Sequence, residues 1–211
     1  MKWLASIGLS GAVLALFAAL TSVAIGWTYL GTKEQIDLQV KRAEARQLLE
    51  IFPSNTHDND LVEDTFEIAA DIPLLALRET RRGYRVRQGG EVVGVILPAT
   101  ARDGYSGDIK ALVGVRKDGS VAGVRVVAHK ETPGLGDKVD LRKSDWILKF
   151  TDRSLRDPQP GGWTVRKEGG DFDQFTGATV TPRAVIIATR RALEYAELHS
   201  NHLFETTTNI L

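Results

Sequence analysis

A long stretch without a charged side chain lies near the amino terminus of the chain. From Trp3 to Thr32 the sequence holds no Asp, Glu, Lys or Arg, and Leu, Ala, Val, Ile and Phe dominate it. This run exceeds the roughly 20 apolar residues that cross a bilayer as a helix. Trp3 at one end and Trp27 near the other stand where interfacial aromatic residues belong. The sequence therefore predicts a transmembrane anchor over residues 1–32, with the span at about residues 7–29.

A cleaved signal peptide is the alternative interpretation of this stretch. The apolar core of a signal peptide is usually about 7–15 residues long, which is shorter than the run observed here, so we favour an uncleaved anchor. The charges that flank the span bear on its orientation. Lys2 precedes the span and four basic residues follow it, so a count of flanking positive charges places the rest of the chain in the cytoplasm. The four that follow are Lys33, Lys41, Arg42 and Arg46.

Composition excludes several classes of function. The 211 residues include 27 Lys plus Arg and 27 Asp plus Glu, so no net positive charge favours binding to nucleic acid. There is no cysteine, which excludes disulfides, thiolate catalysis and Cys-held iron–sulfur clusters within this chain. The four histidines show no metal-ligand spacing, so we expect no metal site. No nucleophile–base pattern or dinucleotide-binding glycine motif is present, so we expect no catalytic residues.

A charged amphipathic helix is predicted to follow the anchor, from Lys33 to Phe52, where Pro53 ends it. Its apolar stripe either packs on the chain's own domain, as a stalk, or contacts a partner subunit, and the sequence does not decide between them. We assign residues 33–82 to this helix and to the N-terminal part of the soluble domain.

Two similar segments further along predict β-hairpins. Residues 86–95 and 115–124 are both rich in β-branched residues, and each is interrupted by a turn signal, Gly89-Gly90 in the first and Asp118-Gly119 in the second. Two hairpins give about four antiparallel strands. The expected fold class is therefore α+β, a twisted and mainly antiparallel sheet flanked by helices.

A glycine-containing loop follows each predicted hairpin. The first is Gly104-Tyr105-Ser106-Gly107, and the second runs from His129 to Gly136 with the sequence HKETPGLG. Glycine lets the backbone approach a flat ligand closely, yet glycine and proline are primarily turn residues. From residue types alone, both loops are structural turns.

The C-terminal third carries weaker signals. Ser144 to Phe150 is predicted as a short helix, and Trp163 to Lys167 as a strand. Trp146 and Trp163 are expected to be core residues first of all. The polar tail over residues 200–211 is expected to be frayed.

A turn that leads into a helix occupies residues 173–182, DQFTGATVTP. Thr181 is a candidate N-cap, and Pro182 suits the first helical position of an amphipathic helix that runs to Leu198. Free N–H groups at such a helix start favour an anion, a phosphate above all. Taken alone, this pattern is no more than a capped turn.

The same stretch resembles the flavinylation motif of the covalent FMN-binding domain family, and the matching residues are Asp173, Thr176, Gly177, Ala178 and Thr179. The two glycine-containing loops and the N-terminal anchor resemble one subtype, the G subunit of the Rnf (Rsx) ion-translocating electron-transport complex. The C subunit of the sodium-pumping NADH:quinone reductase is similar to this subtype. The resemblance covers nearly the whole chain, and it implies a covalent FMN-binding domain over residues 83–199.

The resemblance also implies site residues. One FMN is expected on the Thr179 hydroxyl, as a phosphoester made by a dedicated flavin transferase that uses FAD and a divalent metal. Asp173 belongs to the signature that the transferase reads. The residues expected to contact FMN come from the motif, from the helix start and from the second glycine-containing loop. They are Thr176, Gly177, Ala178, Thr181, Glu131, Thr132, Gly134, Leu135 and Gly136.

The implied function is electron transfer by a membrane-anchored subunit of a complex that couples ferredoxin/NAD redox chemistry to sodium or proton movement. The implied partners are the other membrane subunits of that complex and, transiently, the flavin transferase. The resemblance places the flavin domain on the periplasmic side of the inner membrane, opposite to the charge count. A membrane-tethered flavin reductase acting on a small external acceptor, and an assembly module without flavin, remain as alternatives.

Overall fold

The computed structural model describes residues 2–205, and it describes the side chains of residues 11–36 and 38–205. The chain divides between Glu44 and Ala45 into two compact units. The first unit is helical, and the second contains the end of the same helix, the sheet and the other elements that the structure describes.

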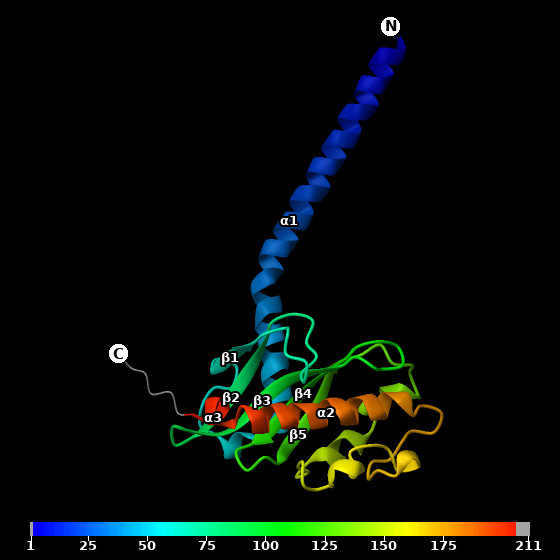
Figure 1. Ribbon diagram of the computed structural model, residues 1–211. Coiled ribbons are helices and arrows are strands. Elements are labelled where there is room, and N and C mark those ends of the chain that lie inside the picture. Colours follow the sequence, from blue (N-terminus) through cyan, green and yellow to red (C-terminus); the bar gives the residue numbers. More distant parts are fainter. Residues whose placement is uncertain (1, 206–211) are drawn as a thin grey trace. The chain divides into compact units, whose positions relative to one another are not determined.

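Helix α1 spans Lys2–Ile51 and includes the predicted span at residues 7–29 (Figure 1). In the part from Gly11 to Ile51, the helix is long and apolar enough to cross a membrane. It ends two residues before Pro53, because a residue that precedes proline is displaced from helical geometry. The predicted charged helix after the anchor is therefore confirmed as the continuation of α1.

The sheet of the second unit has five antiparallel strands in sequential order. They are β1 (Thr65–Ile68), β2 (Arg81–Gln88), β3 (Glu91–Ala101), β4 (Ile109–Arg116) and β5 (Val121–Ala128). Strands β2 to β5 form the two predicted hairpins, and the mainly antiparallel α+β fold class is confirmed. The short strand β1, which pairs with β2, has no counterpart in the prediction.

Glycines close both hairpins in the way the sequence predicts. Gly89 and Gly90 have φ of 61° and 84°, and they form the two-residue loop between β2 and β3. Positive φ at both loop residues defines the type I′ turn, whose twist matches that of the strands. Gly119, with φ of 83°, supplies the left-handed position in the loop between β4 and β5.

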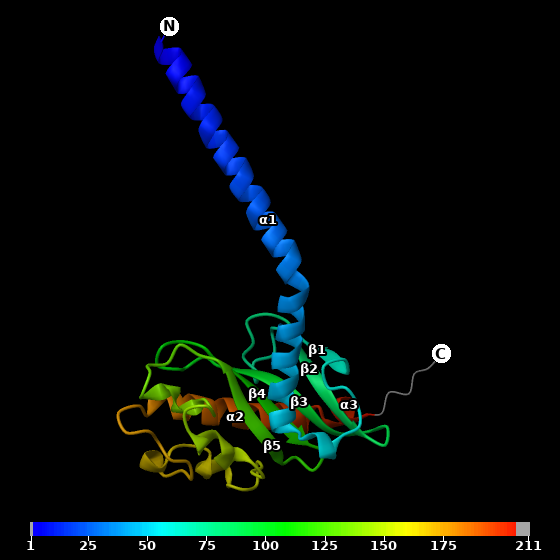
Figure 2. The ribbon, with the colours of Figure 1, turned by 180° about the vertical axis from the view of Figure 1, so that it is seen from behind.

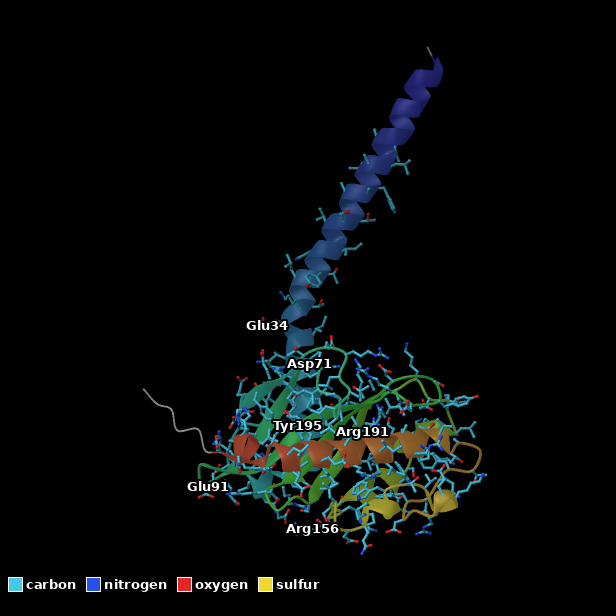
Figure 3. All side chains as sticks on the ribbon, in the orientation of Figure 1. Glu34, Asp71, Glu91, Arg156, Arg191 and Tyr195 are labelled. Atoms are coloured by element: carbon cyan, nitrogen blue, oxygen red, sulfur yellow. The ribbon has the colours of Figure 1, made fainter. Side chains whose placement is uncertain are left out.

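One face of the sheet is covered by helix α2 (Val180–Leu198), which crosses β3 and β4 (Figure 1). The helix has a buried and an exposed side, since Tyr195 is buried and Arg191 is exposed (Figure 3). Short 3₁₀ helices extend this layer: η2 (Gly136–Val139), η3 (Asp145–Phe150), η4 (Pro160–Gly162) and η5 (Arg166–Glu168). Together they enclose the larger of the two hydrophobic clusters found among the described residues.

The opposite face of the sheet holds the last turn of α1 (Figure 2). The glycines that it covers lie on neighbouring strands, Gly94 on β3 and Gly114 on β4. A Cβ atom at position 114 would lie 2.2 Å from Cγ2 of Ile51, and one at position 94 would lie 2.5 Å from Cζ of Phe52. The helix end can therefore lie this close to the sheet only because these positions lack side chains.

Two details differ from the sequence prediction. Residues 163–167 do not form a strand; Val165 makes a single bridge to Phe172 and is followed by η5. The glycines at 169 and 170 turn the chain directly after η5, so the segment is too short to pair along a neighbouring strand.

The segment after His199 continues as α3 (Ser200–Phe204), because Leu203 is buried. The rest of the tail predicted to be frayed, residues 206–211, lies outside the described residues. A fifth 3₁₀ helix, η1 (Ser54–Thr56), follows α1.

Candidate functional site

A pocket of about 380 Å³ lies where three loops meet. The loops precede β4, follow β5 and precede α2. Its volume falls within the range of about 300–1,000 Å³ that is common for small-molecule sites. The residues that line it are Tyr105, Glu131, Thr132, Leu135, Gly136, Gly177, Ala178, Thr179, Val180 and Thr181.

A tight turn forms one wall of the pocket. The N–H of Ala178 donates a hydrogen bond of 3.0 Å to the carbonyl oxygen of Phe175, which closes the turn. Gly177 has φ of 80°, the value found at the third residue of a type II turn. Phe175 is buried and so fixes the start of the turn in the core. Thr179 follows the turn directly.

Helix α2 begins earlier than the sequence predicts. Thr179, not Thr181, occupies the N-cap position, and Pro182 is the third helical residue rather than the first. Pro182 is tolerated there because the N–H groups of the first turn have no partner within a helix. The prediction of Thr181 as the cap is wrong because the Thr181 hydroxyl bonds to Glu131 instead.

The start of α2, which lines the pocket, has unpaired hydrogen-bond donors. Threonine at an N-cap usually accepts a hydrogen bond from the helix, but the Thr179 side chain makes no capping bond. Within residues 2–205, the backbone N–H groups of Thr179, Val180 and Thr181 have no hydrogen-bond acceptor. All three residues line the pocket. The half-buried Thr179 and three neighbouring N–H groups without an acceptor thus belong to residues that line one pocket at a helix N-terminus, where an anion is favoured.

The carboxylate of Glu131 ties the loops together. It accepts a hydrogen bond of 2.5 Å from the Thr181 hydroxyl and one of 2.9 Å from the N–H of Ser106. Glu131 is only 5 % exposed. One carboxylate oxygen accepts from the start of α2 and the other from the loop before β4, so this side chain connects the segments around the pocket.

Two glycines make room for this carboxylate. A Cβ atom at Gly136 would lie 2.8 Å from the Glu131 carboxylate and 2.7 Å from the Thr181 hydroxyl. A Cβ atom at Gly104 would lie 3.0 Å from the same carboxylate and 2.2 Å from a backbone oxygen. At both glycines, the backbone therefore lies closer to the Glu131 carboxylate than a residue with a side chain could lie.

Two exposed apolar side chains border the pocket. Tyr105 is 74 % exposed and Leu135 is 41 % exposed. Leu135 lies across from the turn, because a Cβ atom at Gly177 would be 3.5 Å from its Cδ2. The pocket therefore has a polar end at the start of α2 and an apolar part beside Leu135.

The structure brings most of the predicted contact residues to this pocket. Glu131, Thr132, Leu135, Gly136, Gly177, Ala178, Thr179 and Thr181 line it. Thr176 and Gly134 lie in the same loops, but are exposed and outside the lining. Tyr105 and Val180 were missed. The signal that could have identified Tyr105 is its position as an aromatic residue between two glycines. Val180 was missed because the helix was expected to begin at Pro182.

Asp173 lies apart from the pocket. Its carboxylate forms ion pairs with Lys149 of η3 and, at 3.0 Å, with Arg166 of η5. Its carbonyl oxygen accepts a hydrogen bond of 2.7 Å from Nε1 of Trp146. The hydrogen bond from Lys149, then its charge and that of Arg166, lower the pKa of Asp173. Asp173 is therefore ionised at neutral pH and held by two helices.

The other residues singled out in the sequence have structural surroundings. Trp146 and Trp163 are buried in an aromatic cluster with Phe150 and Phe172, and neither lines the pocket. Nδ1 of His129 accepts a hydrogen bond of 3.1 Å from the N–H of Glu131. That bond helps to fix the start of the second glycine-containing loop.

Comparison with known proteins gives consistent matches over most of the chain. Residues 104–194 match the FMN-binding domain family, and residues 1–51 match the RnfG N-terminal region. Three relatives are named as the G subunit of an ion-translocating oxidoreductase complex. The protein of Pseudoalteromonas atlantica is 43 % identical over 94 % of this chain and 92 % of its own length. That of Vibrio cholerae is 41 % identical over 95 % of both chains, and that of Pseudomonas aeruginosa is 45 % identical over 90 % and 89 %.

The matched regions coincide with the parts of the structure. The match to the RnfG N-terminal region ends at the residue where α1 ends. The match to the FMN-binding domain begins at the first glycine-containing loop and includes the whole pocket. The identities extend over nine-tenths or more of the chain. The chain therefore belongs to the family formed by the G subunits of ion-translocating oxidoreductase complexes.

Proposed function

We propose that this protein is an electron-transfer subunit of an ion-translocating oxidoreductase complex, and that it carries one FMN joined to the Thr179 hydroxyl through a phosphoester. The observation that carries the proposal is the free Thr179 hydroxyl beside three unpaired N–H groups at the start of α2. A phosphate attached to this hydroxyl would meet those donors directly.

The charge of the pocket supports an ester rather than free binding. Among the described residues that line it, none is Lys or Arg, and Glu131 places a carboxylate nearby. A phosphate monoester such as free FMN carries about −1.5 to −2 charges at neutral pH. An ester to Thr179 leaves one charge, which N–H groups and the helix dipole can balance. The site thus suits attached FMN better than free FMN.

A transferase would make the bond. The Thr179 oxygen would form a bond to the riboflavin-side phosphorus of FAD while the pyrophosphate P–O bond breaks, so that AMP leaves and the hydroxyl proton passes to solvent. Thr179 is half-buried, and the neighbouring Thr176 and Gly177 are exposed, so the turn is open to another protein. The donor set at the start of α2 would then retain the phosphate.

Other residues of the pocket would hold and orient the ring. Leu135 and Tyr105 offer apolar surface at its border, and Thr132 and Gly136 belong to the same loop as Leu135. FMN, when bound, supplies the capacity to accept and donate electrons. The chain's part is to fix the position of the flavin and to shape the charge around it. The partially exposed border leaves a route for electrons to and from neighbouring redox subunits.

The helix α1 and the family support a proposal for the location of the protein in the cell. We infer that α1 crosses the inner membrane once and that the flavin domain, residues 83–199, lies on the periplasmic side. The apolar helix and the name shared by the relatives support a membrane complex. The basic residues after the span argue for the opposite orientation. The partners are the other membrane subunits of the complex and, transiently, the flavin transferase.

Substitution at the attachment site tests the proposal. The protein is produced with its flavin transferase and separated on a denaturing gel, where only covalent flavin remains fluorescent. Thr179→Ala should show no fluorescence, and Thr179→Ser should retain some, because serine keeps the hydroxyl. Thr176→Ala, a matched change three residues away, should affect attachment less. Fluorescence that persists in Thr179→Ala would overturn the assignment.

A further inference from the structure

Asp173 takes part in the flavinylation motif, but its position is unlike that of the other motif residues. Gly177, Ala178 and Thr179 line the pocket, whereas Asp173 does not. Its side chain is 36 % exposed, and both carboxylate oxygens are engaged, one by Lys149 and the other by Arg166. The Asp173 carboxylate is therefore already paired with Lys149 and Arg166 of the same chain when a transferase binds.

The 3₁₀ geometry of η3 explains why two of its residues reach Asp173 together. In a 3₁₀ helix there are three residues per turn, so side chains at positions i and i+3 project on the same side. Trp146 and Lys149 are related in this way. Trp146 donates to the carbonyl oxygen of Asp173 and Lys149 binds its carboxylate. The helix therefore holds both the backbone and the side chain of one residue.

The same helix supports the turn that precedes Thr179. The ring of Phe175 packs edge-on against Trp146, with 5.1 Å between the ring centroids. The segment from Asp173 to Phe175 is thus fixed to η3 at its N-terminal end. Further along the chain, the hydroxyl of Thr181 is hydrogen-bonded to the buried Glu131. Residues 176–180, which include the attachment residue Thr179, therefore lie between two segments that are fixed to the rest of the domain.

We infer that Trp146, Lys149 and Arg166 are positioning residues for the covalent modification, and that Asp173 serves the motif by anchoring the attachment segment to η3 and η5. This inference rests on the proposed attachment of FMN to Thr179. The transferase meets an already folded turn that presents the Thr179 hydroxyl, and it does not need to bind the Asp173 carboxylate itself.

The size of the effect follows from the exposure of the pairs. Lys149 and Arg166 are partly solvent-exposed, and ion pairs of this kind are individually weak. Loss of one pair should therefore lower the rate of flavinylation about twofold to fivefold, by reducing the fraction of chains whose turn is in place. Loss of the Asp173 charge removes both pairs and should lower the rate further.

The test is a rate measurement on the full-length protein in detergent. The apoprotein is incubated with purified flavin transferase, FAD and Mg²⁺, and flavin incorporation is followed by intact mass. Lys149→Ala and Asp173→Asn should both lower kcat/KM for the apoprotein. The control is Lys143→Ala, an exposed lysine just before η3 for which no ion pair is found among the described residues, and its rate should equal that of wild type.

Charge exchange separates anchoring from recognition by the transferase. The double variant Lys149→Glu/Asp173→Lys restores an opposite-charge pair and should flavinylate faster than Asp173→Lys alone. If Lys149 and Asp173 affected only the stability of the fold, the double variant would not flavinylate faster than Asp173→Lys when the two have the same unfolding temperature. A wild-type rate for Lys149→Ala, or no recovery in the double variant when it is folded, would overturn the inference. Absence of flavin from the wild-type protein would instead overturn the proposed attachment, and the inference with it.

Discussion

The hydroxyl of Thr181 donates a hydrogen bond of 2.5 Å to the carboxylate of Glu131, a residue 50 positions earlier in the chain. Both side chains are buried. The bond joins the start of α2 to the loop after β5, and the N–H of Ser106 joins the loop before β4 to the same carboxylate. The side chain of Glu131 therefore holds the three segments around the pocket together through hydrogen bonds within the protein.

Removal of this bond should destabilise the protein measurably. Thr181→Val keeps the shape of the side chain but leaves an oxygen of the buried Glu131 carboxylate without its donor. Leaving a buried polar group unsatisfied costs about 1–3 kcal/mol. We expect a fall of this size in the free energy of unfolding, measured by chemical denaturation, together with slower flavin attachment.

Thr189→Val is the matched control for this substitution. Thr189 is also buried on α2, but its hydroxyl donates to the carbonyl oxygen of Val185 in the same helix. That carbonyl faces a helical N–H as well, so loss of the hydroxyl leaves no group unsatisfied. Equal destabilisation by the two substitutions would show that the Thr181–Glu131 bond has no special role.

Leu135 should influence the flavin without influencing its attachment. Because its side chain borders the pocket, Leu135→Ala should expose the ring to water and change the flavin absorption spectrum or midpoint potential. Leu148→Ala is the control, since Leu148 is similarly exposed, at 43 %, but does not line the pocket. A spectrum and potential unchanged in Leu135→Ala would argue against contact between the loop and the ring.

The sequence predicted the framework of this site but not its internal bonds. The two hairpins were predictable because Gly89-Gly90 and Asp118-Gly119 are turn signals that depend on adjacent residues only. The role of Thr181 was not, because its partner is 50 residues away and competes with local capping. Local residue preferences also favoured a strand at residues 163–167, where the glycines that follow and the packing of Trp163 determine the conformation.

Close packing of α1 on the sheet makes a separate prediction about the fold. In Gly114→Ala the new methyl group would lie 2.2 Å from Cγ2 of Ile51. Overpacking of this kind costs about 1–3 kcal/mol. Gly123→Ala, at the position paired with Gly114 on the next strand, meets its nearest atom at 3.4 Å and should cost less. Denaturation of the two variants checks the difference, and a larger loss for Gly123→Ala would contradict the described packing.

The orientation of the membrane anchor can be tested with single cysteines, because the natural sequence has none. In Ser54→Cys the thiol is at an exposed position after α1. If the flavin domain is periplasmic, a membrane-impermeant maleimide should label it in cells with a permeabilised outer membrane. Lys2→Cys, before the span, should be labelled only after lysis. The reverse pattern would place the domain in the cytoplasm, as the count of positive charges does.

Mass analysis of the protein purified from its native host, intact and as peptides, shows whether FMN is joined to Thr179. We expect the intact chain to be heavier than the polypeptide by one FMN minus one water, with the whole increment on Thr179. A bare polypeptide mass, or a flavin on any other residue such as Thr176, would contradict the proposed attachment.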